Sequence, residues 1–276
     1  MLEGHDPIRE RRIESLRKGP LLFSERKMVR ELEGPILSIV EQLRPEIEKG
    51  EYKLILGDDA SGRIPTFIIG HVCKTIYEAN NMRPPLVRPI AGSSKLNRSD
   101  ENKKLNMVAA QIGKMKATAT RYFGNDLGKV LIMTDTITGG SSVGVLIEAL
   151  RENDWKADVA TIGITPGGKI KKTLERDWDS RIVYAMEGTP EIYGRTNLSG
   201  VIQDRTWTSA KNKEKKDTEN NDEEKNNKEI EKAILFAKPL GSHHDDETRA
   251  ARALSQDVAD RIAHEFLSGK GSPRSL

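Results

Sequence analysis

The chain has 276 residues, of which 36% are hydrophobic and 32% are charged. This composition can form a core, which excludes a wholly disordered chain, and the high charge indicates a strongly hydrophilic segment somewhere. The net charge of +3 is too balanced to imply nucleic-acid binding, and a single cysteine, Cys73, excludes an intrachain disulfide. Because no apolar run has the length of a membrane helix and the N-terminus lacks a signal-peptide pattern, we expect a soluble cytoplasmic protein.

Helices are predicted before residue 49. Residues 8–18 mix charges of both signs and predict a short helix, whose basic side chains either form a solvated face or contact phosphate. A longer helix is predicted over 24–48, where Ser24 can cap the start, apolar residues recur at helical spacing and Gly50 follows the end. We therefore assign 1–48 to an N-terminal helical extension.

Strands and helices alternate between residues 53 and 186. Short apolar runs predict strands over 53–57, 86–92, 129–133, 157–165 and 180–186. Helices are predicted over 62–80 and over 143–153. Between them, the polar residues 93–106 predict a mobile loop, and a further helix is expected to follow this loop and to end at about Ala117. This alternation is typical of an α/β fold, a Rossmann-like, mostly parallel sheet flanked by helices, and we assign it to a domain over 49–207.

The C-terminal third begins with a charged tract. Residues 211–232 hold 7 Lys, 8 Asp or Glu and 5 Asn, with Ile230 as the single apolar residue. Such a composition predicts a solvated insertion or linker, which we place at 208–232. Beyond it, a strand over 233–240 and an amphipathic helix over 245–267 are expected to pack on the main domain as a unit of 233–276.

The turn after the strand 129–133 carries the strongest chemical signal. In VLIMTDTITGGSS (130–142), glycines let the backbone wrap closely, the next helix begins there, and hydroxyls are supplied by Thr138, Ser141 and Ser142. Amides at a helix N-terminus favour an anion such as a phosphate monoester. Asp135 follows the strand end, where a carboxylate suits ribose hydroxyls or water around Mg²⁺. The alternative is an ordinary strand-to-helix turn with a serine N-cap.

This segment resembles the phosphoribosyl pyrophosphate motif of the type I phosphoribosyltransferase family. Carried over without gaps, the family's acidic pair falls on Thr134 and Asp135, and its phosphate loop falls on Gly139, Gly140, Ser141 and Ser142. The copy departs from the family at Thr134, which replaces the first carboxylate, and at Gly139, which replaces a residue that is often threonine.

Two further segments resemble the same family in its chain order. LILGDDASGRIP (54–65) resembles its pyrophosphate loop, which implies ligand contacts from the amides of Ala60, Ser61, Gly62 and Arg63, with Asp59 or Asp58 near Mg²⁺. A helix N-terminus with aspartate caps is the alternative. LVRPIAGSSKL (86–96) resembles the strand that delivers an arginine to pyrophosphate and opens into a lid. The matching positions are Arg88 and Lys95, although Arg88 could equally form a surface ion pair.

The resemblance covers about 50–205 and implies the type I phosphoribosyltransferase fold, a homodimer and a Mg²⁺ cofactor. The implied activity is transfer of ribose 5-phosphate from phosphoribosyl pyrophosphate to a nitrogenous base, with Asp135, Arg88 and Lys95 as catalytic residues. The alternative is a sensor or regulatory effector that binds phosphoribosyl pyrophosphate or a nucleotide without turnover. A nucleic-acid effector is a third hypothesis.

Three other patterns favour structural interpretations. GITPGGKI (163–170) lacks the hydroxyl that a Walker A loop needs after its lysine and predicts a connection after a strand. His71 and Cys73 are expected within a helix. Asp245 in the run 243–246 is expected to cap the last helix rather than to bind a metal.

Overall fold

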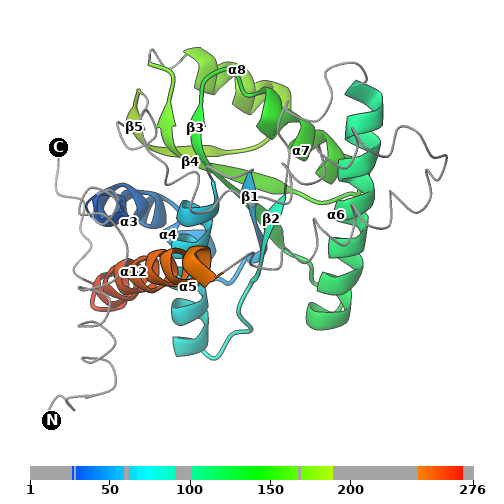
Figure 1. The fold of residues 1–276 in the computed structure, drawn as a ribbon. Helices are drawn as coiled ribbons and strands as arrows, with labels where there is room; N and C mark the ends of the chain where they lie inside the picture. The colour runs from blue at the N-terminus through cyan, green and yellow to red at the C-terminus, as the bar shows by residue number, and fades with distance from the viewer. Residues whose placement is uncertain are drawn as a thin grey trace, which may run out of the picture.

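The fold is known from a computed structural model, which describes residue 27 and residues 29–58, 62–90, 101–166, 169–188 and 242–269. Five parallel strands of this part form one sheet with the order β2-β1-β3-β4-β5 (Figure 1). The strands are β1 (Tyr52–Asp58), β2 (Leu86–Ile90), β3 (Lys129–Ile137), β4 (Ala157–Ile164) and β5 (Ile182–Glu187). The predicted α/β class is confirmed, and each of the five strands occurs where the sequence places one.

Helices cover both faces of the sheet. One face carries α5 (Arg63–Ala79), and the other carries α6 (Glu101–Phe123), α7 (Ser141–Glu152) and α8 (Lys169–Trp178). Alternate residues of a strand point to opposite faces of the sheet. Ile55 and Leu131 pack on the α5 side, whereas Leu54 and Val130 pack on the α6 and α7 side. Strands buried on both faces read as continuous apolar runs, which is why the sequence identifies them so clearly.

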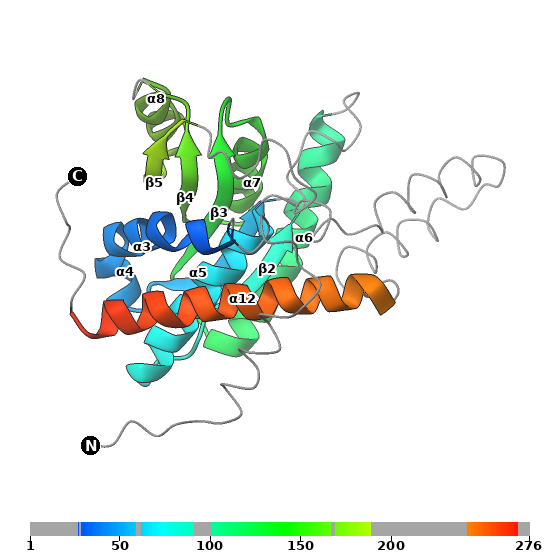
Figure 2. The same ribbon diagram turned by 60° about the vertical axis from the view of Figure 1, so that its left-hand side comes forward.

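Three additional helices thicken the layer that contains α5. They are α3 (Glu33–Gln42), α4 (Arg44–Glu48) and α12 (Ser242–Leu267), and Figure 2 shows α12 lying across α5. The predicted stripe on α12 is confirmed, because its members are all buried: Ala250, Leu254, Val258, Ile262 and Phe266. The single helix predicted over 24–48 is wrong, since within the described residues it is interrupted at Leu32, before α3 begins, and again at Leu43. Pro45 lacks the N–H that a continuous helix would require there.

Several boundaries differ from the sequence prediction. The last helix, α12, begins at Ser242, so the expectation that Asp245 caps it is wrong: Asp245 lies within its first turn. The loop predicted over 93–106 is wrong from Glu101 onward, because α6 begins there and runs to Phe123 rather than to Ala117. Its first apolar residue in the sequence is Leu105, which packs against the core, so no apolar period marks its start. The turn predicted after Met133 is shorter than expected, because Thr134, Thr136 and Ile137 still pair with β4.

Several expectations concern residues outside the described part. These are the helix over 8–18, the loop residues 59–61 and 93–100, the end of the predicted domain from residue 189 on, the charged tract and the strand over 233–240. Among the helices of the described ranges, none is long and apolar enough to cross a membrane.

Candidate functional site

The strand order reverses its direction between β1 and β3. The chain moves from β1 outward to β2 and then returns past β1 to form β3, β4 and β5. Pairing of β1 with β3 ends at Gly57 and Met133, whereas β3 continues beside β4 as far as Ile137. In open parallel sheets, ligands bind beyond the carboxyl ends of the strands at such a switch point. The two loops that resemble phosphate and pyrophosphate motifs both begin there.

The N-terminus of α5 packs directly against this switch point. Gly62 precedes the helix, and its N–H donates to the carbonyl of Asp58 over 3.1 Å. A Cβ atom added at Gly62 would lie 2.5 Å from the Asp58 carbonyl oxygen and 2.8 Å from that of Met133. Position 62 therefore requires glycine, because any side chain would push the helix away from both strands. Among the described residues no side chain caps this helix, whereas Asp59, one of the two aspartates considered as a cap, lies outside them.

The N-terminus of α7 is also uncapped. Gly140 adopts a left-handed conformation, with φ of +78°, and its carbonyl accepts from the N–H of Gly144 over 2.8 Å. No side-chain cap is present, so the predicted alternative of a serine N-cap is wrong. Within the described ranges, no backbone carbonyl accepts from the amides of residues 138–143. Exposed Thr138, Gly139 and Ser141 leave this end of the helix accessible to an anion.

Two side chains of α8 pack against the loop before α7. A Cβ atom at Gly140 would lie 3.0 Å from two ring carbons of Trp178 and 3.2 Å from Leu174. Trp178 is buried, and its indole also lies near Gly144. Sequence reasoning missed both supporting residues, because they follow a different strand and nothing in their spacing points to residue 140.

Asp135 is held by its two neighbours in β3. Its Oδ1 accepts from the backbone N–H of Thr136 over 2.7 Å and from the Thr134 hydroxyl over 3.3 Å. Thr134 is buried, with 2% of its surface exposed, whereas Asp135 is half-buried. Thr134, at the first position of the motif's acidic pair, thus supplies a hydroxyl that orients the carboxylate of Asp135 at the second position.

Arg88 lies on β2, the strand beside β1. In the pairing of the two strands, Arg88 lies opposite Leu56, which is two residues before the end of β1. The Nη1 of Arg88 donates to the carbonyl of Val87 over 2.8 Å. The side chain is exposed, and in the described part no contact joins it to residues 134–142. Of the other expected ligand residues, Gly62 precedes α5 and Arg63 begins it. The others lie outside the described residues: Asp59, Ala60, Ser61 and Lys95.

Thr165, directly after β4, is a further residue that sequence reasoning missed. It binds the carbonyls of Ile137 and Thr138, the two residues that lead into the loop. It belongs to the segment 163–170 that almost spells a Walker A loop. That segment connects β4 to α8, as predicted.

His71 and Cys73 lie within α5, also as predicted, and His71 Nε2 lies 3.1 Å from Asp260 Oδ1 of α12.

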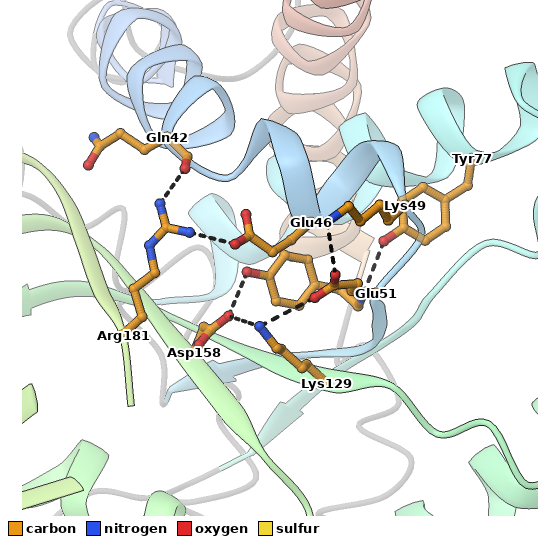
Figure 3. A network of polar contacts seen from close by, with 9 residues as sticks. Gln42, Glu46, Lys49, Glu51, Tyr77, Lys129, Asp158 and Arg181 are labelled. Carbon is orange, nitrogen blue, oxygen red and sulfur yellow. Dashed lines mark hydrogen bonds and ion pairs between the residues drawn. The ribbon is translucent and has the colours of Figure 1, made fainter. Parts of the chain in front are cut away.

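A second polar cluster lies at the amino ends of the strands (Figure 3). The phenol of Tyr52 donates to Asp158 Oδ2 over 2.9 Å, and Lys129 Nζ lies 3.4 Å from the same oxygen and 3.3 Å from Glu51. Burial, together with the neighbouring Asp158 charge, raises the pKa of Tyr52. Arg181 binds both Glu46 and the carbonyl of Gln42. These contacts join β1, β3 and β4 to one another and connect α3 and α4 to Arg181, the residue before β5, so we interpret the cluster as structural.

No group of three or more His, Cys, Asp or Glu side chains that could hold a metal ion occurs within the described ranges. This is compatible with Mg²⁺, which proteins usually bind through one or two carboxylates together with substrate phosphates and water. Asp58, which ends β1, and Asp135, in the part of β3 that extends past β1, provide carboxylates at the switch point.

Comparisons of the chain with models of protein families, with curated proteins and with solved structures found no match.

Proposed function

We propose that this protein is a phosphoribosyltransferase of the type I kind, which binds phosphoribosyl pyrophosphate and transfers ribose 5-phosphate to a nitrogenous base. Pyrophosphate is the leaving group. The observation that carries the proposal is a pair of helix N-termini, of α5 and α7, at the switch point of a parallel sheet, neither of which has a side-chain cap among the described residues. A ligand with an anionic group at each end matches two such sites better than a ligand with one.

The two helix ends have separate roles in this proposal. The amides and hydroxyls of residues 138–142 bind the 5-phosphate, because α7 begins there without a side-chain cap from the described part of the chain. The N-terminus of α5, with Gly62 and Arg63, binds the pyrophosphate together with the loop residues 59–61. Arg88 and Lys95 complete the cationic surroundings of the pyrophosphate once the ligand is bound. This assignment follows the family resemblance of the two loops.

Asp135 has the central role at the ribose. Its carboxylate is held at Oδ1 by Thr136 and Thr134, so it is oriented before a ligand arrives. It binds the ribose hydroxyls and favours the positive charge that develops at C1 as the bond to pyrophosphate breaks. The helix N-terminus of α5 favours the negative charge on the departing group. Exclusion of water from C1 protects the reacting sugar from hydrolysis.

Mg²⁺ is the cofactor of this proposal. Asp58 and Asp135 are the carboxylates of the described residues that would hold it through water. When bound, the ion neutralises charge on the pyrophosphate oxygens.

An assay of pyrophosphate release tests the proposal. The protein is incubated with Mg²⁺, phosphoribosyl pyrophosphate and a panel of purine, pyrimidine and other nitrogenous bases. We expect one class of base to support release, and we expect Asp135→Asn to reduce turnover at least about 100-fold, the usual effect of losing a group that stabilises transition-state charge.

Asp126→Asn is the matched control. Its side chain is 80% exposed and lies 3.6 Å from Lys53, at the amino end of the sheet, so turnover should stay unchanged. Equal loss in both variants would contradict the role of Asp135. Failure of the wild-type protein to bind any phosphorylated ribose would contradict the whole proposal.

A binding protein without turnover is the second candidate. Thr134 favours it, because a buried hydroxyl stands where the family has a carboxylate, and this hydroxyl is engaged with Asp135. Tight binding of phosphoribosyl pyrophosphate with no product from any base would support a sensor. In that case, Thr134→Asp tests whether a second carboxylate restores turnover.

A further inference from the structure

Thr165 makes three hydrogen bonds to two consecutive residues, Ile137, which ends β3, and Thr138, which follows it. Its backbone N–H donates to the carbonyl of Ile137 over 3.0 Å. Its hydroxyl is shared between two carbonyl oxygens, that of Thr138 at 3.1 Å and that of Ile137 at 3.3 Å. Two consecutive carbonyls are therefore drawn toward one residue after β4. In a regular strand, consecutive carbonyls point to opposite sides, so this is a local departure from strand geometry.

These carbonyls determine the direction of the next amides. In a trans peptide, the C=O of one residue and the N–H of the next lie in one plane and point in opposite directions. Because the Ile137 and Thr138 carbonyls point toward Thr165, the N–H groups of Thr138 and Gly139 point away from it. Thr165 follows β4, and β1 lies on the other side of β3. The amide of Thr138 is thereby directed toward the side of β3 where the switch point lies.

The other surroundings of the loop agree with this direction. A Cβ atom added at Gly139 would meet no heavy atom of the described residues within 4 Å, so the space around its backbone is open. At Gly140, by contrast, Trp178 packs against the position that a Cβ atom would take. The first amides of α7 follow directly, so the amides of residues 138 and 139 extend the donor set of the helix N-terminus.

We propose that Thr165 is a positioning residue for the anion-binding loop: its hydroxyl holds the Thr138 carbonyl, so that the Gly139 amide faces a bound phosphate. The inference rests on the proposed function and adds to it a residue from the end of β4, outside the three segments that resemble the family. Thr165 acts through the loop backbone and does not itself contact the ligand.

Thr165→Val tests this role. Valine has the shape of threonine and keeps the backbone N–H bond to Ile137, but it loses the hydroxyl that binds the Thr138 carbonyl. The probes are ribose 5-phosphate and inorganic phosphate, measured by calorimetry, with ribose as the control that lacks a phosphate. We expect Thr165→Val to weaken ribose 5-phosphate binding by about 3- to 10-fold, the range expected for one net hydrogen bond. Thr165→Ser retains the hydroxyl and should restore the wild-type affinity.

Thr161→Val is the matched control for the loss of a threonine hydroxyl from the same segment. The Thr161 hydroxyl is buried and donates to the carbonyl of Gly163 over 2.8 Å, within β4 itself. We expect it to change stability without changing ribose 5-phosphate affinity. A spectroscopic measurement separates positioning from stability: the Gly139 amide resonance of the free protein should shift in Thr165→Val and not in Thr165→Ser.

The outcomes distinguish the two proposals. If the wild type binds ribose 5-phosphate and Thr165→Val binds it equally well, the positioning role is wrong while the proposed function stands. Equal weakening in Thr161→Val and Thr165→Val would also overturn the role, because the loss would then follow general destabilisation. If the wild type binds neither ribose 5-phosphate nor inorganic phosphate, the proposed function fails first, and the role of Thr165 in phosphate binding fails with it.

Discussion

Gly140 combines two constraints that are usually separate. Its φ of +78° is unfavourable for residues with a side chain, and Trp178 occupies the space that a Cβ atom would need. The neighbouring Gly139 has neither constraint, because its Cβ position is open and its φ is not in the left-handed region. Of the two adjacent glycines, Gly140 is therefore required by the backbone conformation and by packing, whereas neither requires glycine at position 139.

Alanine substitutions separate these reasons. We expect Gly140→Ala to lower the free energy of unfolding by about 1–3 kcal/mol, the cost of a left-handed non-glycine residue together with the displaced indole. Gly139→Ala should change it by less than about 0.5 kcal/mol. Urea denaturation of the two variants and the wild type measures both values. Equal destabilisation would show that the close approach of Trp178 to the loop is not the constraint.

Cys73 gives the folded state a dependence on alkaline pH. Complete burial raises the pKa of its thiol from 9.0 to about 12. Above pH 9 the unfolded chain releases this proton while the folded chain keeps it, so the unfolded state binds fewer protons and stability falls as pH rises. The raised pKa of Tyr52 and Tyr77, caused mainly by burial, acts in the same direction at higher pH.

The expected effect of Cys73 is a loss of about 1.4 kcal/mol in the free energy of unfolding between pH 8 and pH 10. Cys73→Ala should remove most of this loss, although the variant has lower stability at both pH values because of the cavity. Denaturation curves recorded under reducing conditions give the two differences. The same pH dependence in wild type and variant would assign the alkaline loss to other groups.

At the scale of elements, the attachment of α12 depends on its apolar stripe. Ile262 is 1% exposed and packs in the core shared with α3 and α5. Arg261, the next residue toward the N-terminus, makes a two-point contact with Glu33 of α3, at 2.9 and 2.8 Å, and also binds Asp257. The side chain of Arg261 is 42% exposed, so water screens much of this attraction.

Adjacent substitutions in α12 compare the two contributions. We expect Ile262→Ala to lower the free energy of unfolding by about 2–5 kcal/mol, and Arg261→Met to lower it by less than about 1 kcal/mol. Thermal and urea unfolding of both variants measures the difference. A larger effect of Arg261→Met would mean that the ion pair, rather than the buried stripe, holds α12 on the domain.

The elements also show what sequence patterns can and cannot determine. The central strands are apparent because each is buried on both faces, and β4 is buried along its whole length. The extension of β3 through Thr134 and Ile137 is not apparent, because it depends on pairing with β4, which follows in the chain only after the whole of α7. The start of α6 is missed for a related reason, since its first residues precede the apolar stripe.

The same distinction applies to the candidate site. The sequence predicts the positions of Gly62, Asp135 and Gly140, because each lies in a local pattern of strand, turn and helix. It does not predict Thr165 or Trp178, because their contacts with the loop connect separate strand-helix units. Local chemistry is readable from spacing, whereas the contacts that orient a loop depend on the tertiary arrangement.

At the scale of the whole molecule, the two ends of the sheet differ in their polar organisation. At the amino ends, the buried charges are paired within the protein, as the contacts of Asp158 with Tyr52 and Lys129 show. At the carboxyl ends, two helices begin without a side-chain cap from any residue that the structure describes. Buried polar groups that are satisfied internally stabilise a fold, while accessible helix N-termini remain able to bind an anion.

Tyr52→Phe tests this division between the two ends. The substitution keeps the buried ring but removes the hydroxyl that donates to Asp158, leaving Lys129 as the contact of that carboxylate oxygen. We expect the free energy of unfolding to fall by about 1–3 kcal/mol, because a buried acceptor loses a donor. Ribose 5-phosphate affinity, measured by calorimetry well below the melting temperature, should stay within about twofold of the wild type. A large loss of affinity would mean that the amino-end cluster is coupled to the carboxyl end through β1, and the separation of a structural end from a binding end would then be wrong.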